Sequence, residues 1–297
     1  MNDIGTTGLA LAFEDNRTHL LAVAYRLTGS WADAEDAVQE AWLRLHRAGE
    51  RAGIRDLRAW LTVAVGRLCL DRLRSAPVRR ERHVGPWLPE PVVTDLDDGD
   101  GPAAAVVRDE GVRMAALVVL ERLTPDQRVA FVLHDAFDVP FAEIAGLLGC
   151  SPAAARQHAS RARRIVADAD PPPRAALADQ QKILAEFAAA IAGGDLEAVV
   201  RLLHPDAVLI GDGGGVESTA RRPIVGPDRI ARFLLGLQRK YGDTAGDGRP
   251  VLVNGDLGLV VPATAATARR VVTLSVRDGL VAAVYDVVDP GKLTRVP

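Results

Sequence analysis

The sequence predicts a multidomain fold in which two all-α domains precede an α+β domain. Apolar residues recur at three- and four-residue steps through the first two thirds of the chain, and this is the period of amphipathic helices. Near the C-terminus the pattern changes to short apolar runs separated by Asn254-Gly255 and Asp278-Gly279, dipeptides typical of β-hairpin turns. Proline-rich segments separate the blocks, and 297 residues suffice for two or three domains.

The composition is that of an ordinary folded protein of the cytoplasm. The hydrophobic share is 48% and the charged share 25%, both near the average for globular domains. The first 13 residues lack the basic start and apolar core of a signal peptide, and no apolar run reaches the length of a membrane span. Cys69 and Cys150 lie far apart without metal-ligand spacing, so no metal and no other cofactor are expected.

The first block contains two amphipathic helices. One helix has an apolar stripe made of Ala34, Val38, Ala41, Trp42 and Leu45. The second helix is expected from Asp56 to Arg74. Between residues 55 and 82 there are eight arginines and three acids, a cluster suited to binding phosphates although the net charge of the chain is −3. A solvated basic face is the alternative interpretation.

The pattern of the second block indicates a helix-turn-helix at its end. Helices are expected over 106–123, 125–135, 140–148 and 152–166. Ser151 would cap the last of them, and its outward side carries Arg156, Gln157, Arg161 and Arg164. Arg and Gln suit bidentate reading of base edges, so we assign Arg156 and Gln157 to bases and Arg161 and Arg164 to phosphates. A purely structural helical hairpin is the alternative.

A stiff segment, Gly85 to Pro91, lies between these blocks and runs into acidic residues. It contains three prolines, which exclude a helix because each removes a backbone donor. A passive tether would be rich in Gly, Ser or charge, whereas Trp87 and Leu88 are apolar and suited to docking on another surface. Local packing of Trp87 against the preceding helix is the alternative.

The third block is expected to fold as an α+β cone. Helices are expected over 176–192 and 227–241. Strand-like runs occupy 207–211, 251–253, 258–261, 270–276 and 280–288. Helices followed by hairpin-linked strands predict a curved antiparallel sheet, as in an α+β cone.

Several stretches resemble the extracytoplasmic-function (ECF) sigma factors. Those of the first block resemble region 2 of that family: 25–30, 33–40, 58–61 and 71–74. Those of the second block resemble region 4, the reader of the −35 promoter element: 121–128, 141–145 and 160–163. The resemblance implies that the chain directs transcription initiation with core RNA polymerase and promoter DNA as partners.

The resemblance also implies roles for particular residues. The family's polymerase-binding helix, which contacts the clamp helices of the largest subunit, maps onto Asp36, Ala37, Val38 and Gln39; the flap would be a second contact. The −10 element would be read and opened by Trp60, Arg72, Arg74, Arg79 and Arg80, with Trp60 stacking on a base or packing in the core. Arg67 departs from the Asn usual in the family.

The glycine run Asp212-Gly213-Gly214-Gly215, together with Trp87 to Pro91, resembles the SigJ-type ECF sigma factors, which carry a fused SnoaL-like (NTF2-like) domain. The resemblance implies regulation in cis by that domain, with no separate anti-sigma protein. We therefore predict that Trp87 and Leu88 dock near Asp212 to Gly215. The stretch 289–293 departs from the family's Asn-Pro-Asp-Lys-Leu at Asp289 and Gly291.

The expected domains are region 2 over 8–82, a linker over 83–105, region 4 over 106–168 and the SnoaL-like domain over 175–297. His204, Asp212 and Asp286 are the candidates for acid–base chemistry in the cone, but their spacing shows no convergence, so the chain is not expected to be an enzyme. Two alternatives stay open: a ligand-sensing helix-turn-helix regulator, and an enzyme fused to a DNA-binding module.

Overall fold

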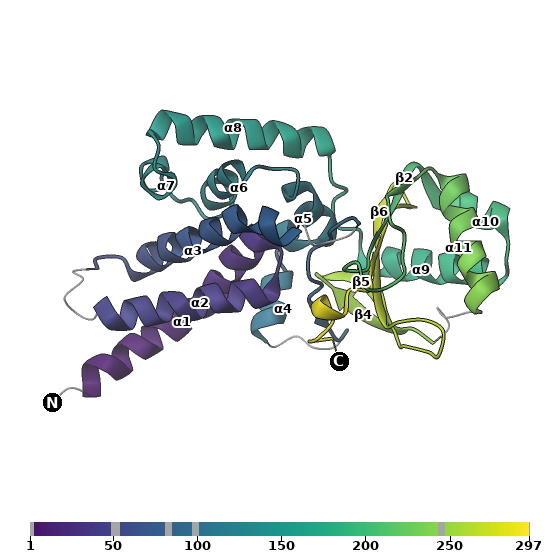
Figure 1. Cartoon of the computed structure of the whole chain (residues 1–297), viewed down its shortest axis with the longest axis horizontal. Helices are drawn as coiled ribbons and strands as arrows, with labels where there is room; N and C mark the ends of the chain where they lie inside the picture. Colours follow the sequence, from purple (N-terminus) through teal and green to yellow (C-terminus); the bar gives the residue numbers. More distant parts are fainter. Residues whose placement is uncertain (1–2, 49–53, 81–84, 97–100, 243–246, 297) are drawn as a thin grey trace. The chain divides into compact units, whose positions relative to one another are not determined.

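The computed structural model describes residues 3–48, 54–80, 85–96, 101–242 and 247–296. The chain forms two compact units, both drawn in Figure 1. The helical unit comprises Met1–Arg79, Asp100–Val112 and Ala116–Pro171. The sheet unit comprises Arg80–Gly99, Arg113–Ala115 and Pro172–Pro297. The segment between the two helical blocks therefore belongs to the sheet unit.

The helical unit is built from short and long helices in sequence order. Its first block holds α1 (Asp3–Thr28), α2 (Trp31–Ala48) and α3 (Leu57–Arg80). Its second block holds α4 (Pro102–Val107), η2 (Glu110–Val112), α5 (Met114–Leu120), α6 (Pro125–Phe131), the π-helical turn η3 (Val132–Ala136), α7 (Phe141–Leu148) and α8 (Pro152–Ala169). In the part of the chain that the structure describes, no helix has the length and hydropathy needed to cross a membrane.

Helix α2 forms where the apolar stripe predicts it. Ser30 accepts a hydrogen bond from the backbone N–H of Asp33 (3.2 Å) and so caps the helix. The stripe residues Ala34, Val38 and Leu45 are buried, and Trp42 packs against Phe13 of α1 with ring centroids 5.0 Å apart. The predicted inner face is confirmed, and it leaves the opposite face of α2 exposed.

The two helical blocks pack against each other, with α3 against η3 and α7 and with α6 against the end of α1. A Cβ at Gly66 of α3 would lie 3.0 Å from a methyl group of Leu133 and 3.1 Å from one of Leu147, so the absence of a side chain permits close packing. Arg128 of α6 is buried, and its Nη1 donates to the carbonyl of Leu27 (3.1 Å) and to Glu121 (2.6 Å). A buried guanidinium that donates to residues of both blocks connects them within one core.

The prediction of a single helix over 106–123 is wrong. Asp109 Oδ1 accepts from the backbone N–H of Gly111 (2.8 Å) and from Nη2 of Arg26 (2.6 Å), and this local bonding competes with helix continuation. A Cβ at Gly111 would lie 1.2 Å from Nη2 of Arg26. The chain therefore breaks into α4, η2 and α5, and Arg113 turns into the sheet unit.

The predicted helix-turn-helix is present. Thr124 and Gln127 form a reciprocal capping box at the start of α6. Gly149 ends α7 in the left-handed region with φ 69°, and Ser151 caps α8 by accepting from the N–H of Ala154 (3.2 Å). The alanines of α8 that were predicted to face inward are buried: Ala155, Ala159 and Ala162.

The sheet unit is a seven-stranded sheet with order β1-β4-β5-β6-β7-β2-β3. Its strands are β1 (Val93–Thr94), β2 (Leu203–Asp212), β3 (Ile224–Val225), β4 (Arg249–Val253), β5 (Asp256–Val261), β6 (Arg270–Arg277) and β7 (Leu280–Val287). Its helices are α9 (Leu177–Ala192), α10 (Leu196–Leu202) and α11 (Pro227–Tyr241), with the 3₁₀ turn η4 (Pro290–Lys292) near the end. The helices cover one face of the sheet (Figure 1).

The hairpin turns are confirmed, but the fully antiparallel sheet is not. Asn254-Gly255 and Asp278-Gly279 have positive φ throughout, as type I′ turns require. Strand β2 pairs with β7 in parallel, with Leu209 opposite Val284. A parallel pair needs a crossover, and the intervening chain from β3 to β6 provides it.

Part of the predicted linker is a strand of this sheet. Val93 of β1 lies opposite Val253 of β4, and Thr94 lies opposite Leu252. The backbone N–H of Val92 donates to Asn254 Oδ1 (3.1 Å), and the N–H of Asn254 donates to the carbonyl of Val92 (2.8 Å). The residues before β1 are also inside: Leu88, Pro89, Glu90, Pro91 and Val92 are buried.

His19 occupies a partly buried position at the contact of the two helical blocks. Its Nε2 lies 2.9 Å from Thr62 Oγ1 and its Nδ1 2.9 Å from Arg58 Nη2. The ring meets Phe137 edge-on, with centroids 5.3 Å apart. Burial, and secondarily the positive charge of Arg58, lower the pKa of His19 from 6.5 to about 4.

We expect the free energy of unfolding of the helical unit to fall as pH drops from about 6.5 to about 4. In that pH window His19 of the unfolded chain binds a proton that folded His19 does not bind, so protonation stabilises the unfolded state relative to the folded one. Urea titrations at several pH values should show this slope, and His19→Gln should flatten it. His46→Gln, at an exposed position of α2, is the control. An unchanged slope in His19→Gln would contradict the assignment.

Candidate functional site

The candidate site is the place where three distant motifs meet around Asp212. Its carboxylate is completely buried, with 0% exposure. Oδ2 accepts from the backbone N–H of Leu88 (2.7 Å) and from Nζ of Lys292 (2.6 Å). A buried carboxylate needs both a counter-charge and hydrogen bonds, and here the segment before β1 and the 3₁₀ turn η4 supply them. We call Leu88, Asp212 and Lys292 the anchor.

Lys292 is the centre of the anchor because it contacts both other motifs. Besides Asp212, its Nζ donates to the carbonyl oxygen of Leu88. The same ammonium lies 4.0 Å from the ring centroid of Trp87, within the range of a cation–π interaction. Both backbone groups of Leu88 are thus held, the N–H by Asp212 and the carbonyl by Lys292. Trp87 thus contacts Lys292, and Leu88 contacts both Asp212 and Lys292.

The glycines after Asp212 allow a turn too tight for side chains. Asp212 Oδ1 accepts from the N–H of Gly214 (3.0 Å). Gly214 has φ 63°, and a Cβ there would lie 2.5 Å from Cγ of Asp289. A Cβ at Gly213 would lie 2.2 Å from a backbone oxygen of Glu217. Gly215 also has positive φ, 76°, so the run is required by backbone conformation and close approach.

The two departures in the stretch 289–293 leave the turn intact. Asp289 Oδ1 accepts from the N–H of Gly291 (2.9 Å), and a carboxylate oxygen makes this bond as an amide oxygen would. The backbone N–H groups of Val288 and Asp289 both donate to the carbonyl of Asp212, at 2.7 and 3.1 Å. The backbone of β7 and η4 therefore presents Lys292 to Asp212.

A second polar cluster of the sheet unit surrounds Asp256. Arg113, 3% exposed, places Nε 2.8 Å from Asp256 Oδ2 and donates from Nη1 to the carbonyl of Pro172 (2.6 Å). Arg174 Nε lies 3.4 Å from Asp256 Oδ1, and Gln180 also approaches that oxygen (3.5 Å). Sequence reasoning missed this cluster, because no local pattern marks Arg113 as different from the other arginines.

The three candidates for acid–base chemistry do not share a site. His204 is half-exposed at the start of β2, and its Nδ1 accepts from the N–H of Asp206 (3.1 Å). Asp286 pairs across the sheet with Gly211. Because successive residues of a strand alternate between faces, Asp286 lies on the helix-covered face with Val284, and Asp212 lies on the opposite face. The geometry therefore assembles no acid–base pair from them.

Two of the four predicted polymerase-binding residues are exposed and two are buried. Asp36 and Gln39 are exposed on α2, whereas Ala37 and Val38 are buried in the helical unit. Leu43 is 38% exposed on the same helix. Residues 36, 39 and 43 recur at helical spacing, so they form a single stripe on which a partner can bind. Ala37 and Val38 contribute packing instead.

Among the described residues predicted to contact the −10 element, Arg72 and Arg74 form ion pairs within the helical unit. Trp60 is half-buried. Arg72 Nε lies 3.5 Å from Asp33, and Arg74 Nη2 lies 3.0 Å from Asp126 of α6. The side chains of Arg79 and Arg80 lie outside the described residues. Arg74, one residue of the predicted −10 set, is thus paired with the second helical block.

The predicted −35 residues are displayed on one helix. Ser151, Arg156, Gln157, Arg161 and Arg164 are all exposed on or next to α8. The guanidinium of Arg156 lies 5.7 Å from the ring centroid of Phe141 in α7, within the range of a cation–π interaction. Exposure at the N-terminal turns of α8 is the arrangement by which a helix-turn-helix presents side chains to the major groove.

We expect Lys292→Met to lower the free energy of unfolding of the sheet unit by about 3–5 kcal/mol, because Asp212 would keep a buried charge without its partner. The backbone amide of Leu88 should then exchange its hydrogen faster. Adding Asp212→Asn should recover part of the loss, since no charge is left unpaired. Lys182→Met, at an exposed position of α9, is the control. Additive losses in the double variant would show that the two side chains are not coupled.

Comparison with known proteins follows the same division of the chain. The family model for Sigma-70 region 2 matches residues 12–77, that for Sigma-70 region 4 matches residues 113–166, and that for the SnoaL-like domain matches residues 184–296. The match of region 4 begins at Arg113, the residue whose side chain pairs with Asp256.

Relatives cover nearly the whole chain. The ECF RNA polymerase sigma factor SigJ of Mycobacterium tuberculosis is 52% identical over 96% of this chain and 93% of its own length. The probable ECF sigma factor SigI of the same species is 36% identical over 76% of each chain. The crystal structure of the M. tuberculosis SigJ matches 96% of this chain and 98% of that one, with a TM-score of 0.80 at 49% identity. The chain therefore belongs to the ECF RNA polymerase sigma factors, which act with core polymerase in transcription initiation, and it carries a SnoaL-like domain after its two sigma regions.

Proposed function

We propose that the SnoaL-like domain regulates this sigma factor in cis by holding the segment between regions 2 and 4 at the anchor. The observation that supports this proposal is the burial of Asp212 between Lys292 and the backbone N–H of Leu88. The segment leads from region 2 to region 4, so its docking limits how far the two regions can separate. No separate anti-sigma protein is needed in this scheme, and the SnoaL-like domain acts without catalysis.

The resting state in this proposal is closed. Arg74 pairs with Asp126 of α6, and Gly66 packs on Leu133 and Leu147 of the second block. Reading −10 and −35 elements together requires regions 2 and 4 to lie apart on DNA, and these contacts oppose that. Release of the segment lengthens the free connection between the regions, and lengthening a flexible connection costs little entropy.

Within the polymerase complex, Asp36 and Gln39 contact the clamp helices of the largest subunit, with Ala37 and Val38 packing beneath them. Region 4 contacts the flap. Trp60 stacks on an unpaired base of the −10 element, and Arg72, Arg74, Arg79 and Arg80 hold the displaced backbone. The half-burial of Trp60 is compatible with one exposed ring face.

Helix α8 reads the −35 element. Arg156 and Gln157 lie in its first turns and are suited to guanine and adenine edges. Arg161 and Arg164 lie further along the exposed side and neutralise phosphates. Ser151 caps the helix and orients its N-terminus toward the DNA, where the helix dipole favours a phosphate.

We expect Trp87→Ala to raise run-off transcription by the full-length chain with core polymerase about fivefold. Its ring lies 4.0 Å from Lys292, and losing a cation–π contact of ~1 kcal/mol shifts a docking equilibrium about fivefold. Promoters can be selected from a random library by the wild-type holoenzyme. Leu96→Ala, an exposed residue of the same segment, is the control. Unchanged or lower activity of Trp87→Ala would overturn inhibition by docking, while the wild-type signal tests the sigma activity separately.

The −35 assignment predicts two distinct phenotypes in holoenzyme binding assays. Arg156→Ala with Gln157→Ala should relax the preference for the −35 sequence by about tenfold or more, since a bidentate base contact contributes ~1–3 kcal/mol of discrimination. Arg161→Ala with Arg164→Ala should weaken binding to all sequences and reduce the salt slope by about 1.8.

Equal loss of sequence preference in both pairs would contradict the division between base and phosphate contacts.

A pull-down with core polymerase tests the exposed stripe of residues 36, 39 and 43 on α2. Asp36→Ala with Gln39→Ala should abolish capture of the chain by core polymerase without changing its thermal unfolding, because both side chains are exposed. Asp15→Ala, an exposed acid of α1, is the matched control, and loss of capture by this variant would argue for a nonspecific charge effect.

A further inference from the structure

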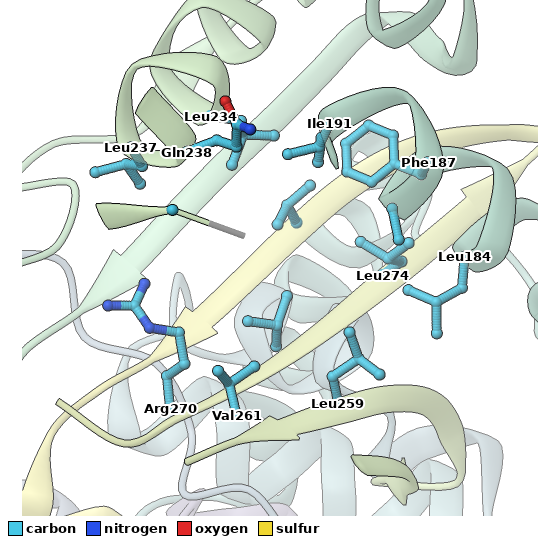
Figure 2. Close-up of a pocket in the computed structure, with 14 residues that line it drawn as sticks. Leu184, Phe187, Ile191, Leu234, Leu237, Gln238, Leu259, Val261, Arg270 and Leu274 are labelled. Carbon is cyan, nitrogen blue, oxygen red and sulfur yellow. The ribbon is translucent and has the colours of Figure 1, made fainter. Parts of the chain in front are cut away.

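The SnoaL-like domain contains an apolar cavity of about 130 Å³ between its helices and the helix-covered face of its sheet (Figure 2). Leu184, Phe187 and Ile191 of α9 line one side. Strands β5, β6 and β7 supply apolar side chains on the other, among them Leu259 and Leu274. The cavity lies on the opposite face of the sheet from Asp212, so it is distinct from the anchor.

One charged side chain breaks the apolar lining. Arg270 lies at the edge of the cavity beside Val261 (Figure 2), and its side chain is 17% exposed. Gln238 is the other polar lining residue, and its amide donates to the carbonyl of Ala192 (3.4 Å). A guanidinium with five N–H donors is thus placed against an otherwise apolar cavity.

Arg270 makes only a long contact with its counter-ion, Asp286. Its Nη1 lies 3.3 Å from Asp286 Oδ2, and that oxygen also accepts the shorter bond from Thr219 Oγ1 (2.7 Å). Asp286 Oδ1 is buried and finds no hydrogen-bond partner among the described residues. Burial raises the pKa of Asp286, which means that this environment disfavours its charged form. Arg270 therefore keeps donors and positive charge for a further acceptor.

We propose that this cavity binds a small monocarboxylate with an apolar body of about one ring, the carboxylate meeting the guanidinium of Arg270. A planar guanidinium matches a carboxylate with two parallel hydrogen bonds. The apolar lining accommodates the body, and a cavity of roughly 150 Å³ lined by Leu, Ile and Phe is large enough for benzene. Larger acids with several polar groups are excluded by the size and the lining.

The experiment is a titration of the full-length chain with benzoate and hexanoate, followed by calorimetry and ligand-observed NMR. Toluene and benzyl alcohol serve as neutral probes of similar size. Both carboxylates should bind at least tenfold more tightly than the neutral probes, because a charge-assisted hydrogen bond to Arg is lost without the carboxylate. Failure of both carboxylates to bind, or equal binding of toluene, would overturn the proposal.

Variants locate the binding in the cavity. Arg270→Met keeps the length of the side chain and should weaken benzoate about tenfold or more while leaving toluene unchanged. Ala188→Leu should fill the cavity from α9 and abolish binding of both classes. Ala185→Leu, on the exposed side of the same helix, is the matched control and should bind as the wild type. Benzoate bound equally by Ala188→Leu would place it elsewhere and refute the site.

Discussion

The buried charge of Asp212 is the constraint on which the arrangement of the sheet unit depends. A carboxylate removed from water must be neutralised and hydrogen-bonded, because its desolvation otherwise costs several kcal/mol. Lys292 and the N–H of Leu88, which are 204 positions apart in the sequence, meet that need. The consequence is a segment between two DNA-binding regions that folds as part of a third domain. The regulation proposed above needs no extra interface, since the segment is already part of that domain.

Elements with local causes could be predicted from the sequence. Helix α2 follows from its apolar stripe and the Ser30 cap, and α8 follows from Ser151 and three buried alanines. The Asn-Gly and Asp-Gly hairpins are equally local, since their positive φ angles belong to the dipeptides themselves. Docking of Trp87 and Leu88 could be expected because they are apolar residues on a segment whose composition does not suit a tether, whereas the part that Lys292 plays was not predicted.

Elements that depend on partners far away in the sequence could not be predicted from the sequence. Strand β1 has two residues and exists only because β4 offers an edge, so its own sequence shows no period. The break at Asp109 is fixed by Arg26, which lies 83 positions away in the sequence. The Arg113–Asp256 pair joins residues 143 apart, and nothing near either residue indicates the other. The parallel pairing of β2 with β7 likewise depends on chain crossing, not on composition.

The sequence separation within the anchor has a consequence for synthesis. Leu88 and Lys292 are 204 positions apart, so a ribosome working at ~5–20 residues per second leaves the segment undocked for roughly 10–40 s. The match to region 4 ends at residue 166, well before Lys292 is made. A nascent chain, or one shortened by a premature stop codon before Lys292, therefore has both sigma regions before the anchor can form. Synthesis of the chain completes the anchor last.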